Sequence, residues 1–523
     1  MSCQIINLEN VSFKYPHSGK YALNELSLSV NKCEFLAVMG ENGAGKTTFC
    51  KLINGIIPHL AGGFLTGTIM VDGINTAHSS VPELALKAGM VFDDPDAQIF
   101  TSSVKSEAAF GLENILLPPQ EIIERVKSAL FAVGLGGFEE RMPSTLSGGE
   151  KQRLSIASVL AMRSDILVLD EPLCRLDPQG VEEVMSVIRD IRTRYNITVI
   201  MSSHESGIMA QYADRVCILK NGRIAALDTA ENIFADTALL EQNGIEPITI
   251  KKEFTTNQTN AHEPINKRDS HKHRTEGPAE AQSFNKVISP LKTSVISVPP
   301  EPKVRCLRVN NLFYSYPAGG GIKNINLSIM ENDFVAIIGD NGCGKTTLLK
   351  TITGLLQPQS GDIEIRGKNT KKLKVSDISK EIGFVMQNPD TQLFCDSVYN
   401  EVAFGLKNKR LSKKEIKQRV DSALEIVSLH DAEAYPHAQC RADRTKTVIA
   451  CVLAMGCKII IFDEVDVGND YLGKIKIMNI AKDLHSRGFT IIFVTHNMSL
   501  VNEYAQRVIK MDNKTIVFDG EKL

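Results

Sequence analysis

The chain has 523 residues, which leaves room for two or more domains of ordinary size. Its 59 Lys and Arg residues nearly balance its 61 Asp and Glu residues, so a generally basic surface is excluded and no nucleic-acid partner is expected. A composition of 43% hydrophobic and 23% charged residues excludes wholesale disorder. The eleven cysteines include no Cys-x-x-Cys pair, which argues against zinc ribbons and iron–sulfur sites.

The first predicted strand of interest is an apolar run, Phe35–Met39, which a glycine-rich loop and an amphipathic helix follow. Such a loop lets backbone N–H groups surround phosphate oxygens at a helix N-terminus, so it predicts a nucleotide site. In it, Lys46 would neutralise the β- and γ-phosphates, and Thr47 would offer its hydroxyl to Mg²⁺. The predicted ATP-binding residues of this loop are Gly40, Glu41, Asn42, Gly43, Ala44, Gly45, Lys46, Thr47 and Thr48.

A second apolar run ends in two acidic residues, Asp170 and Glu171. An apolar run of this kind predicts a buried central strand of a parallel sheet. An Asp at the carboxyl end of that strand lies beside the phosphate loop, so Asp170 is predicted to hold Mg²⁺ together with Thr47. Glu171 is predicted to polarise the attacking water.

These motifs recur in the same order about 290–300 residues later, which indicates a duplicated domain. The apolar run Phe334–Ile338 precedes the second loop, and Asp463 and Glu464 follow a second buried run. Thr346 and Asp463 are therefore the predicted Mg²⁺ ligands of the repeat, and Glu464 its water-polarising residue. The predicted ATP-binding residues of the second loop are Gly339, Asp340, Asn341, Gly342, Cys343, Gly344, Lys345, Thr346 and Thr347.

The two copies are separated by residues 246–303, a polar stretch with seven of the chain's 20 prolines and only two aromatic residues. Such a segment buries too little apolar area to offset its ordering entropy, so we predict a flexible linker. The predicted domains are then 1–245 and 304–523.

The segment Leu146–Arg153, which reads Leu-Ser-Gly-Gly-Glu-Lys-Gln-Arg and precedes a helical stretch, resembles the signature of the ATP-binding-cassette (ABC) ATPases. The resemblance implies tandem α/β P-loop NTPase domains, each with a mostly parallel sheet core, an antiparallel β subdomain and a helical signature subdomain. It also implies an intramolecular head-to-tail pair of domains, in which the signature of one domain closes over ATP bound by the other. The cofactors so implied are ATP and Mg²⁺.

Further site residues follow from this resemblance, position by position. His204 and His496 match the histidines that contact the γ-phosphate, and Gln387 matches the glutamine that serves Mg²⁺ and the attacking water. Tyr15 and Tyr316 match the aromatic residues that stack on adenine. Ser147, Gly148 and Gly149 are the signature residues that bind the nucleotide.

Both copies depart from the family pattern. The loop after Glu464 is altered, with Val467-Gly-Asn-Asp470 where the first copy has Cys174-Arg-Leu-Asp177. The second copy has Cys440, Arg441 and Ala442 where the first has Ser-Gly-Gly, and the first copy has Asp93, still a predicted ATP-site residue, where the second has Gln387. Head-to-tail pairing would gather these departures in one site. We therefore expect a hydrolytic site that joins Lys345 and Glu464 to Ser147. We also expect a degenerate site that joins Lys46 and Glu171 to Cys440 and Arg441, where Arg441 could serve as a surrogate cation.

The stretches after Asp93 and Gln387 look like those of energy-coupling-factor and cobalt or nickel importers, which carry vitamins or transition-metal ions. This likeness implies a transmembrane energy-coupling subunit, a substrate-binding membrane subunit and a peripheral position at the cytoplasmic face of the cell membrane. The sequence has no apolar run long enough to span a membrane and no signal peptide, which also favours an intracellular protein. Two alternatives stay open: a twin-cassette protein of translation or repair without a membrane partner, and a regulatory ATP binder.

Overall fold

The structure is a computed structural model that describes residues 4–248 and 304–521, apart from His17, Arg175, Ala318 and Arg410. Below, the first half means 4–248 and the second half 304–521. Most of the predicted linker, 249–303, lies outside the described residues, so its flexibility and the domain limits at 245 and 304 stay predictions.

Each half contains a four-stranded antiparallel sheet near its start. In the first half its order is β2-β1-β4-β5, and in the second half β12-β11-β14-β15. The strands are β1 (Gln4–Lys14), β2 (Leu23–Asn31), β4 (Phe64–Val71), β5 (Ile74–Asn75), β11 (Arg305–Ser315), β12 (Gly321–Met330), β14 (Ser360–Ile365) and β15 (Lys368–Asn369).

Each half also contains a six-stranded sheet whose strands are parallel except for one edge strand, β10 in the first half and β20 in the second. The orders are β10-β9-β3-β8-β7-β6 and β16-β17-β18-β13-β19-β20. The strands of the first half are β3 (Phe35–Met39), β6 (Ala88–Val91), β7 (Ile166–Asp170), β8 (Thr198–Ser202), β9 (Arg215–Lys220) and β10 (Arg223–Thr229). Those of the second half are β13 (Phe334–Ile338), β16 (Ile382–Val385), β17 (Ile459–Asp463), β18 (Thr490–Val494), β19 (Arg507–Asp512) and β20 (Thr515–Glu521).

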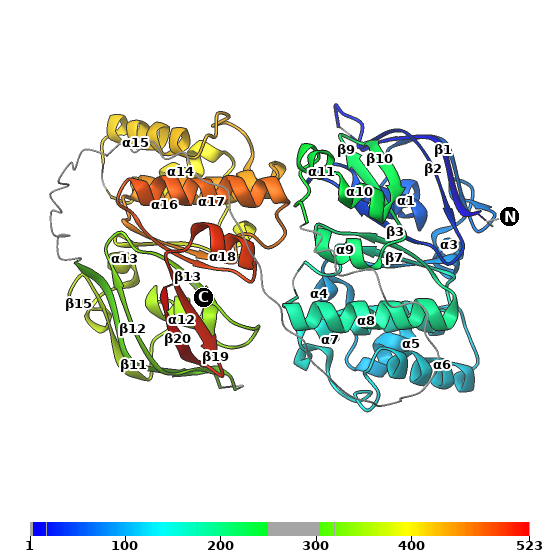
Figure 1. Ribbon diagram of the computed structural model, residues 1–523, viewed down its shortest axis with the longest axis horizontal. Helices are drawn as coiled ribbons and strands as arrows, with labels where there is room; N and C mark the ends of the chain where they lie inside the picture. The colour runs from blue at the N-terminus through cyan, green and yellow to red at the C-terminus, as the bar shows by residue number, and fades with distance from the viewer. Residues whose placement is uncertain are drawn as a thin grey trace, which may run out of the picture. The chain divides into compact units, whose positions relative to one another are not determined.

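Helices cover the six-stranded sheets and form a helical region beside them (Figure 1). In the first half they are α1 (Lys46–Ile53), α2 (Ile56–His59), α3 (Val81–Lys87), α4 (Pro95–Gln98), α5 (Val104–Asn114), α6 (Pro119–Ala132), α7 (Gly148–Ala161), α8 (Pro178–Tyr195), α9 (Ser206–Tyr212), α10 (Ala230–Ala235) and α11 (Thr237–Gln242). In the second half they are α12 (Lys345–Ile352), α13 (Val375–Ile378), α14 (Val398–Lys407), α15 (Lys413–Ile426), α16 (Arg441–Met455), α17 (Tyr471–Ser486) and α18 (Met498–Tyr504).

Two apolar clusters hold each half together, one on each face of its six-stranded sheet. One cluster of the first half includes Phe13 and Phe49 and joins the antiparallel sheet to α1 and the six-stranded sheet. The other includes Leu154 and Ile188 and joins the opposite face to α5, α6, α7 and α8. Every residue of β3 and β7 is buried, as expected of central strands with helices or sheet on both faces. The predicted fold class is confirmed.

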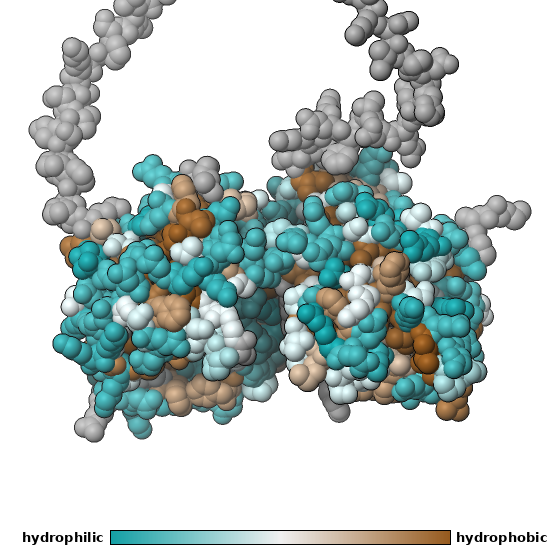
Figure 2. All heavy atoms as spheres, turned by 90° about the horizontal axis from the view of Figure 1, so that it is seen from below, coloured by the Kyte–Doolittle hydropathy of each residue, from teal (hydrophilic) through white to brown (hydrophobic). Residues whose placement is uncertain are grey.

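On the face shown in Figure 2, hydrophilic residues predominate and hydrophobic residues form small separate groups. Within the parts of the chain that the structure describes, no helix is both long and apolar enough to cross a membrane.

Candidate functional site

The glycine-rich loop of the first half lies between β3 and α1, where the sequence predicted it. Gly40 and Gly45 have φ of 140° and 108°, a backbone region that favours glycine. A Cβ at Gly40 would lie 2.2 Å from the carbonyl oxygen of Leu219, so no larger residue fits there. No side chain caps the N-terminus of α1, so its first N–H groups are left for an anion. This cradle fits the phosphates of a nucleotide.

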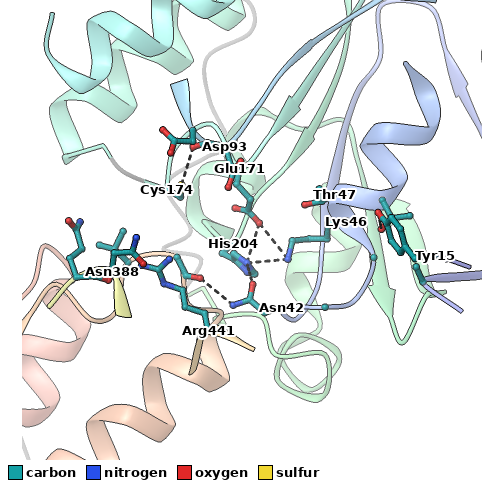
Figure 3. A pocket seen from close by; sticks show the side chains of 18 residues that line it. Tyr15, Asn42, Lys46, Thr47, Asp93, Glu171, Cys174, His204, Asn388 and Arg441 are labelled. Atoms are coloured by element: carbon teal, nitrogen blue, oxygen red, sulfur yellow. Dashed lines mark hydrogen bonds and ion pairs between the residues drawn. The ribbon is translucent and has the colours of Figure 1, made fainter. Parts of the chain in front are cut away.

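A buried lysine lies at the bottom of this loop. The Lys46 Nζ donates to the carbonyl oxygens of Gly40 and Glu41, at 3.0 and 3.2 Å, and lies 3.1 Å from His204 Nε2. Its distance to Glu171 Oε1 is 3.5 Å, and that oxygen is 3.1 Å from His204 Nε2 (Figure 3). Burial, and then the charge of Lys46, hold the pKa of His204 well below its usual value. The loop therefore carries a fixed positive charge beside a neutral imidazole.

The second half repeats this arrangement. Lys345 Nζ donates to the carbonyl oxygens of Gly339 and Asp340, at 2.7 and 3.1 Å, and lies 3.3 Å from His496 Nε2. Glu464 Oε1 is 3.6 Å from the lysine and 3.1 Å from the histidine. Cys343, which stands where the first loop has Ala44, is buried, and this burial raises the pKa of its thiol.

Each predicted pair of Mg²⁺ ligands is a hydroxyl beside a carboxylate. Thr47 Oγ1 donates to Asp170 Oδ1 at 3.2 Å, and Thr346 Oγ1 donates to Asp463 Oδ1 at 3.3 Å. Burial raises the pKa of both aspartates, that of Asp463 to about 6. Because Mg²⁺ prefers hard oxygen ligands and takes the rest from phosphate and water, these pairs suit the ion at the mouth of each loop.

The two glutamates predicted to polarise water, Glu171 and Glu464, differ in their surroundings. Burial raises the pKa of Glu171 to about 7. Burial also opposes ionisation of Glu464, but the hydrogen bond to His496 and the charge of Lys345 outweigh it and lower the pKa of Glu464. Glu464 Oε2 accepts a further hydrogen bond, at 2.9 Å, from Gln387 Nε2.

The first half has Asp93 where the second has Gln387. Its main-chain oxygen accepts from Cys174 Sγ at 3.9 Å, and its charge contributes, after burial, to the raised pKa of Asp170. Asp93 has no side-chain amide N–H, so it cannot make to Glu171 the contact that Gln387 makes to Glu464. Glu464 therefore accepts a hydrogen bond from a side-chain amide at this position, and Glu171 does not.

The two signature segments begin their helices differently. Ser147 caps α7: its Oγ accepts from the Glu150 N–H at 3.2 Å, and Glu150 Oε2 accepts from the Ser147 N–H at 2.7 Å. Gly148 and Gly149 form the first turn of α7. Cys440 begins α16 without a side-chain cap, and its Sγ donates instead to Asp443 Oδ2 at 3.3 Å.

The described residues of both halves belong to one compact unit. In it, Arg441 of the altered signature lines the same cavity as Asn42 and Lys46 of the first phosphate loop. The Asn42 N–H donates to Asp470 Oδ2 at 2.6 Å, and Asn42 Nδ2 donates to the Gly468 carbonyl at 3.2 Å. In the opposite direction, the Asn341 N–H donates to Asp177 Oδ2 at 3.2 Å. All three hydrogen bonds join a phosphate loop to the segment between the predicted water-polarising glutamate and the next helix.

A cavity of about 600 Å³ opens at the first of these junctions (Figure 3). Residues from both halves line it, among them Tyr15, Lys46, Glu171, Gln387, Arg441 and Gly468. Tyr15 is held by an edge-to-face contact with Phe13, with ring centroids 4.8 Å apart, and its hydroxyl lies 3.2 Å from Thr48 Oγ1. Tyr316 makes the matching contacts with Tyr314 at 4.9 Å and Thr347 at 3.5 Å.

Three contacts at these sites were not found from the sequence. Asp177 and Asp470 each cap a helix with one oxygen and accept from the opposite loop with the other. Ser202 donates to Asp170 at 2.7 Å, whereas the paired position of the second sheet is Val494. The aspartates could have been found by their equal spacing from the two glutamates, but a serine on a neighbouring strand gives no local signal.

Comparison with known proteins bears on both halves. The model of the ABC transporter family matches residues 23–174 and again 322–466. A protein of Caldanaerobacter subterraneus subsp. tengcongensis, provisionally named ABC transporter ATP-binding protein, is 35% identical over 100% of this chain and 92% of its own length. A Methanosarcina mazei protein with the same provisional name is 35% identical over 99% of this chain and 89% of its own.

Among solved structures, cbiO1 from Clostridium perfringens, described as part of the ABC transporter complex cbiONQ, is 32% identical. It covers 46% of this chain and 94% of that chain, with a TM-score of 0.42. The family model matches both halves, relatives align over nearly the full length, and each phosphate loop has a Lys, a Glu and a His beside it. The chain is therefore a member of the ABC transporter family, an ATPase with two cassettes that binds ATP with Mg²⁺.

Proposed function

We propose that this protein is the ATP-hydrolysing subunit of an importer and that only one of its two sites drives the cycle. The observation that carries the asymmetry is the hydrogen bond from Gln387 Nε2 to Glu464 Oε2, at 2.9 Å, which Asp93 cannot make to Glu171. Head-to-tail pairing of the cassettes, which the contacts of Asn42 and Asn341 support, would add Ser147 to the second site. The proposed hydrolytic site then joins Lys345, Glu464, His496 and Gln387 to Ser147-Gly148-Gly149.

The first site would hold ATP with little or no turnover. Its glutamate has a pKa of about 7 and lacks an amide donor, and its signature offers Cys440 and Arg441 in place of Ser-Gly. Each lost hydrogen bond to a charged phosphate removes roughly 1.5–3 kcal/mol, so several together slow a step tenfold to thousands of times.

The test is steady-state ATP hydrolysis by the full chain with its membrane partners, comparing two matched substitutions. Glu464→Gln should abolish hydrolysis, because it removes the carboxylate of the proposed hydrolytic site. Glu171→Gln should retain most of it. Retained hydrolysis in Glu464→Gln together with loss in Glu171→Gln would reverse the assignment of the two sites.

We further propose that two equivalent exposed aromatic pairs near Asp93 and Gln387 dock on the cytoplasmic segments of the transmembrane subunit. Phe100 and Phe110 lie edge to face at 4.7 Å and are 66% and 41% exposed, and Phe394 and Phe404 lie at 4.8 Å and are 63% and 47% exposed. Paired aromatic side chains left in solvent on both cassettes are typical of a protein-binding surface.

A buried glutamate fixes each of these loops. Glu107 Oε2 accepts from the N–H groups of Phe100 and Thr101, at 3.2 and 3.0 Å. Glu401 Oε2 accepts from those of Phe394 and Cys395, at 2.8 and 2.7 Å. Because both loops are held in the same way, the two pairs suit two similar segments of a membrane partner.

Membrane association tests this docking surface. In cells that make the protein, the full chain should co-sediment with washed membranes, and Phe100→Ser with Phe394→Ser should release it. Phe131→Ser is the matched control, because Phe131 is 75% exposed on α6 and lies outside the pairs. Co-sedimentation with ribosomes, unaffected by the double substitution, would favour the translation-factor alternative.

A further inference from the structure

The position that is glycine in one signature and arginine in the other has different surroundings in the two halves. In the first half, a cavity of about 230 Å³ lies beside Gly148 and is also lined by Asp93 and Leu176. In the second half, Arg441 stands at this position, and its Nη2 donates to the main-chain oxygen of Gln387 at 2.8 Å. The arginine therefore ties the start of α16 to the residue that matches Asp93.

Arg441 also lines the large cavity at the first phosphate loop, across from Lys46 and Tyr15 (Figure 3). It reaches this place over Gly468, where a Cβ would lie 3.2 Å from the guanidinium carbon. The Gly468 carbonyl in turn accepts from Asn42 of the phosphate loop at 3.2 Å. A planar guanidinium with five donors matches the oxygens of a phosphate, so a bound phosphate would compete for the donor that the Gln387 carbonyl now accepts.

The contact of Arg441 with Gln387 leads on to the second site. While its carbonyl accepts from Arg441, the Gln387 side chain donates to Glu464 Oε2 at 2.9 Å. Glu464 Oε1 lies 3.1 Å from His496 Nε2. Three consecutive polar contacts thus connect the first cavity to Glu464 and His496 at the second site.

We propose that Arg441 binds a phosphate of the nucleotide held at the first site and, through Gln387, couples occupancy of that site to the position of Glu464 at the second. This rests on the proposed function, in which the first site holds ATP and the second hydrolyses it. A phosphate competes with the Gln387 carbonyl for the guanidinium, so binding at the first site shifts the backbone that carries the Gln387 amide. The first half has no equivalent link from the second site to Glu171, because Gly148 has no side chain to contact Asp93 as Arg441 contacts Gln387.

The first measurement is nucleotide affinity, which does not depend on which site hydrolyses. Fluorescent mant-ADP is titrated into the full chain carrying Lys345→Ala, so that binding reports the first site. Arg441→Gly should weaken binding roughly tenfold to a hundredfold, as expected for loss of a charged hydrogen bond. Arg441→Lys should weaken it less, because the charge remains but the planar fork is lost. Arg419→Gly, an exposed arginine of α15, is the matched control and should leave affinity unchanged.

The second measurement is a double-mutant cycle on ATP hydrolysis. Emptying the first site with Lys46→Ala should change the hydrolysis rate severalfold when Arg441 is present, and should have no effect in Arg441→Gly. An affinity within twofold of the parent in both Arg441 variants would overturn the proposal, and so would an undiminished Lys46→Ala effect in Arg441→Gly. Retained hydrolysis in Glu464→Gln would instead refute the assignment of the hydrolytic site and leave the affinity result intact.

Discussion

The two glutamates that we propose polarise water, Glu171 and Glu464, occupy equivalent positions, but their contributions to stability are expected to depend on pH with opposite sign. Burial raises the pKa of Glu171 to about 7. Below about pH 4.5 this carboxyl is protonated in both the folded and the unfolded chain, and between about 4.5 and 7 only the unfolded chain releases the proton. The free energy of unfolding therefore falls across this window as pH rises. Glu464, whose pKa is lowered, contributes stability above pH 4.5 that is lost as pH falls.

Glu171→Gln should accordingly raise the free energy of unfolding of the nucleotide-free chain at pH 8. The rise in the pKa of Glu171 from 4.5 to about 7 corresponds to at most about 3 kcal/mol. The gain should be clearly smaller at pH 5.5. Glu464→Gln should lower stability at pH 8, because it removes a favourable charge. Thermal denaturation of both variants at the two pH values checks this, and a shift in the same direction for both would contradict it.

At the scale of the helix, the same residue position serves as a cap in one half and not in the other. Ser147 and Glu150 form a reciprocal pair of hydrogen bonds at the start of α7. Cys440 cannot cap α16 in this way, although Asp443 occupies the position that corresponds to Glu150. The divergence of the signature thus weakens a helix start as well as a nucleotide contact.

Cys440→Ser should stabilise the second half by about 1 kcal/mol, the usual contribution of an N-cap hydroxyl. Urea denaturation of the full chain measures this. In the parent, the backbone amides in the first turn of α16 should exchange hydrogen faster than those of α7, and this difference should disappear in the variant. The matched change Ser147→Cys should cost the first half a similar amount. Unchanged stability in Cys440→Ser would mean that Asp443 already satisfies the end of the helix.

The elements that carry the site could be predicted because their signals are local. The apolar runs at Phe35–Met39 and Phe334–Ile338 match β3 and β13 residue for residue, and the glycine spacing placed both phosphate loops. The contact of Arg441 with Gln387 could not be predicted, since it joins segments 54 residues apart through one rotamer. Similarly, the sequence of the loop after Glu464 differs between the two copies. That difference does not predict that buried Asp466 accepts a hydrogen bond from Thr495 at 2.6 Å.

At the scale of the whole molecule, two aspartates join each cassette to the other. Asp177 accepts from the Gly180 N–H of its own helix and from the Asn341 N–H of the second phosphate loop, at 2.8 and 3.2 Å. Asp470 accepts from its own Gly473 at 2.7 Å and from Asn42 of the first loop at 2.6 Å. One carboxylate in each case fixes a helix start and a loop of the opposite half together.

Asp177→Asn should lower ATP hydrolysis roughly tenfold with little change in Tm, because asparagine still caps a helix but offers one acceptor oxygen instead of two. Asp470→Asn should instead weaken mant-ADP binding at the first site and reduce hydrolysis less. Steady-state ATPase assays and fluorescence titration separate the two effects. Equal loss of hydrolysis in both variants would argue against a single driving site.

The complementary parts of the proposed hydrolytic site are carried by different cassettes, and this has a consequence for inheritance. Two first cassettes would bring Ser147 to a loop with Asp93, and two second cassettes would bring Arg441 to a loop with Gln387. Only the mixed pair unites Ser147 with Gln387, and a single polypeptide fixes the ratio of the two at one to one as it is made. Gene conversion that copied either half over the other would therefore remove either Ser147 or Gln387 from the proposed hydrolytic site.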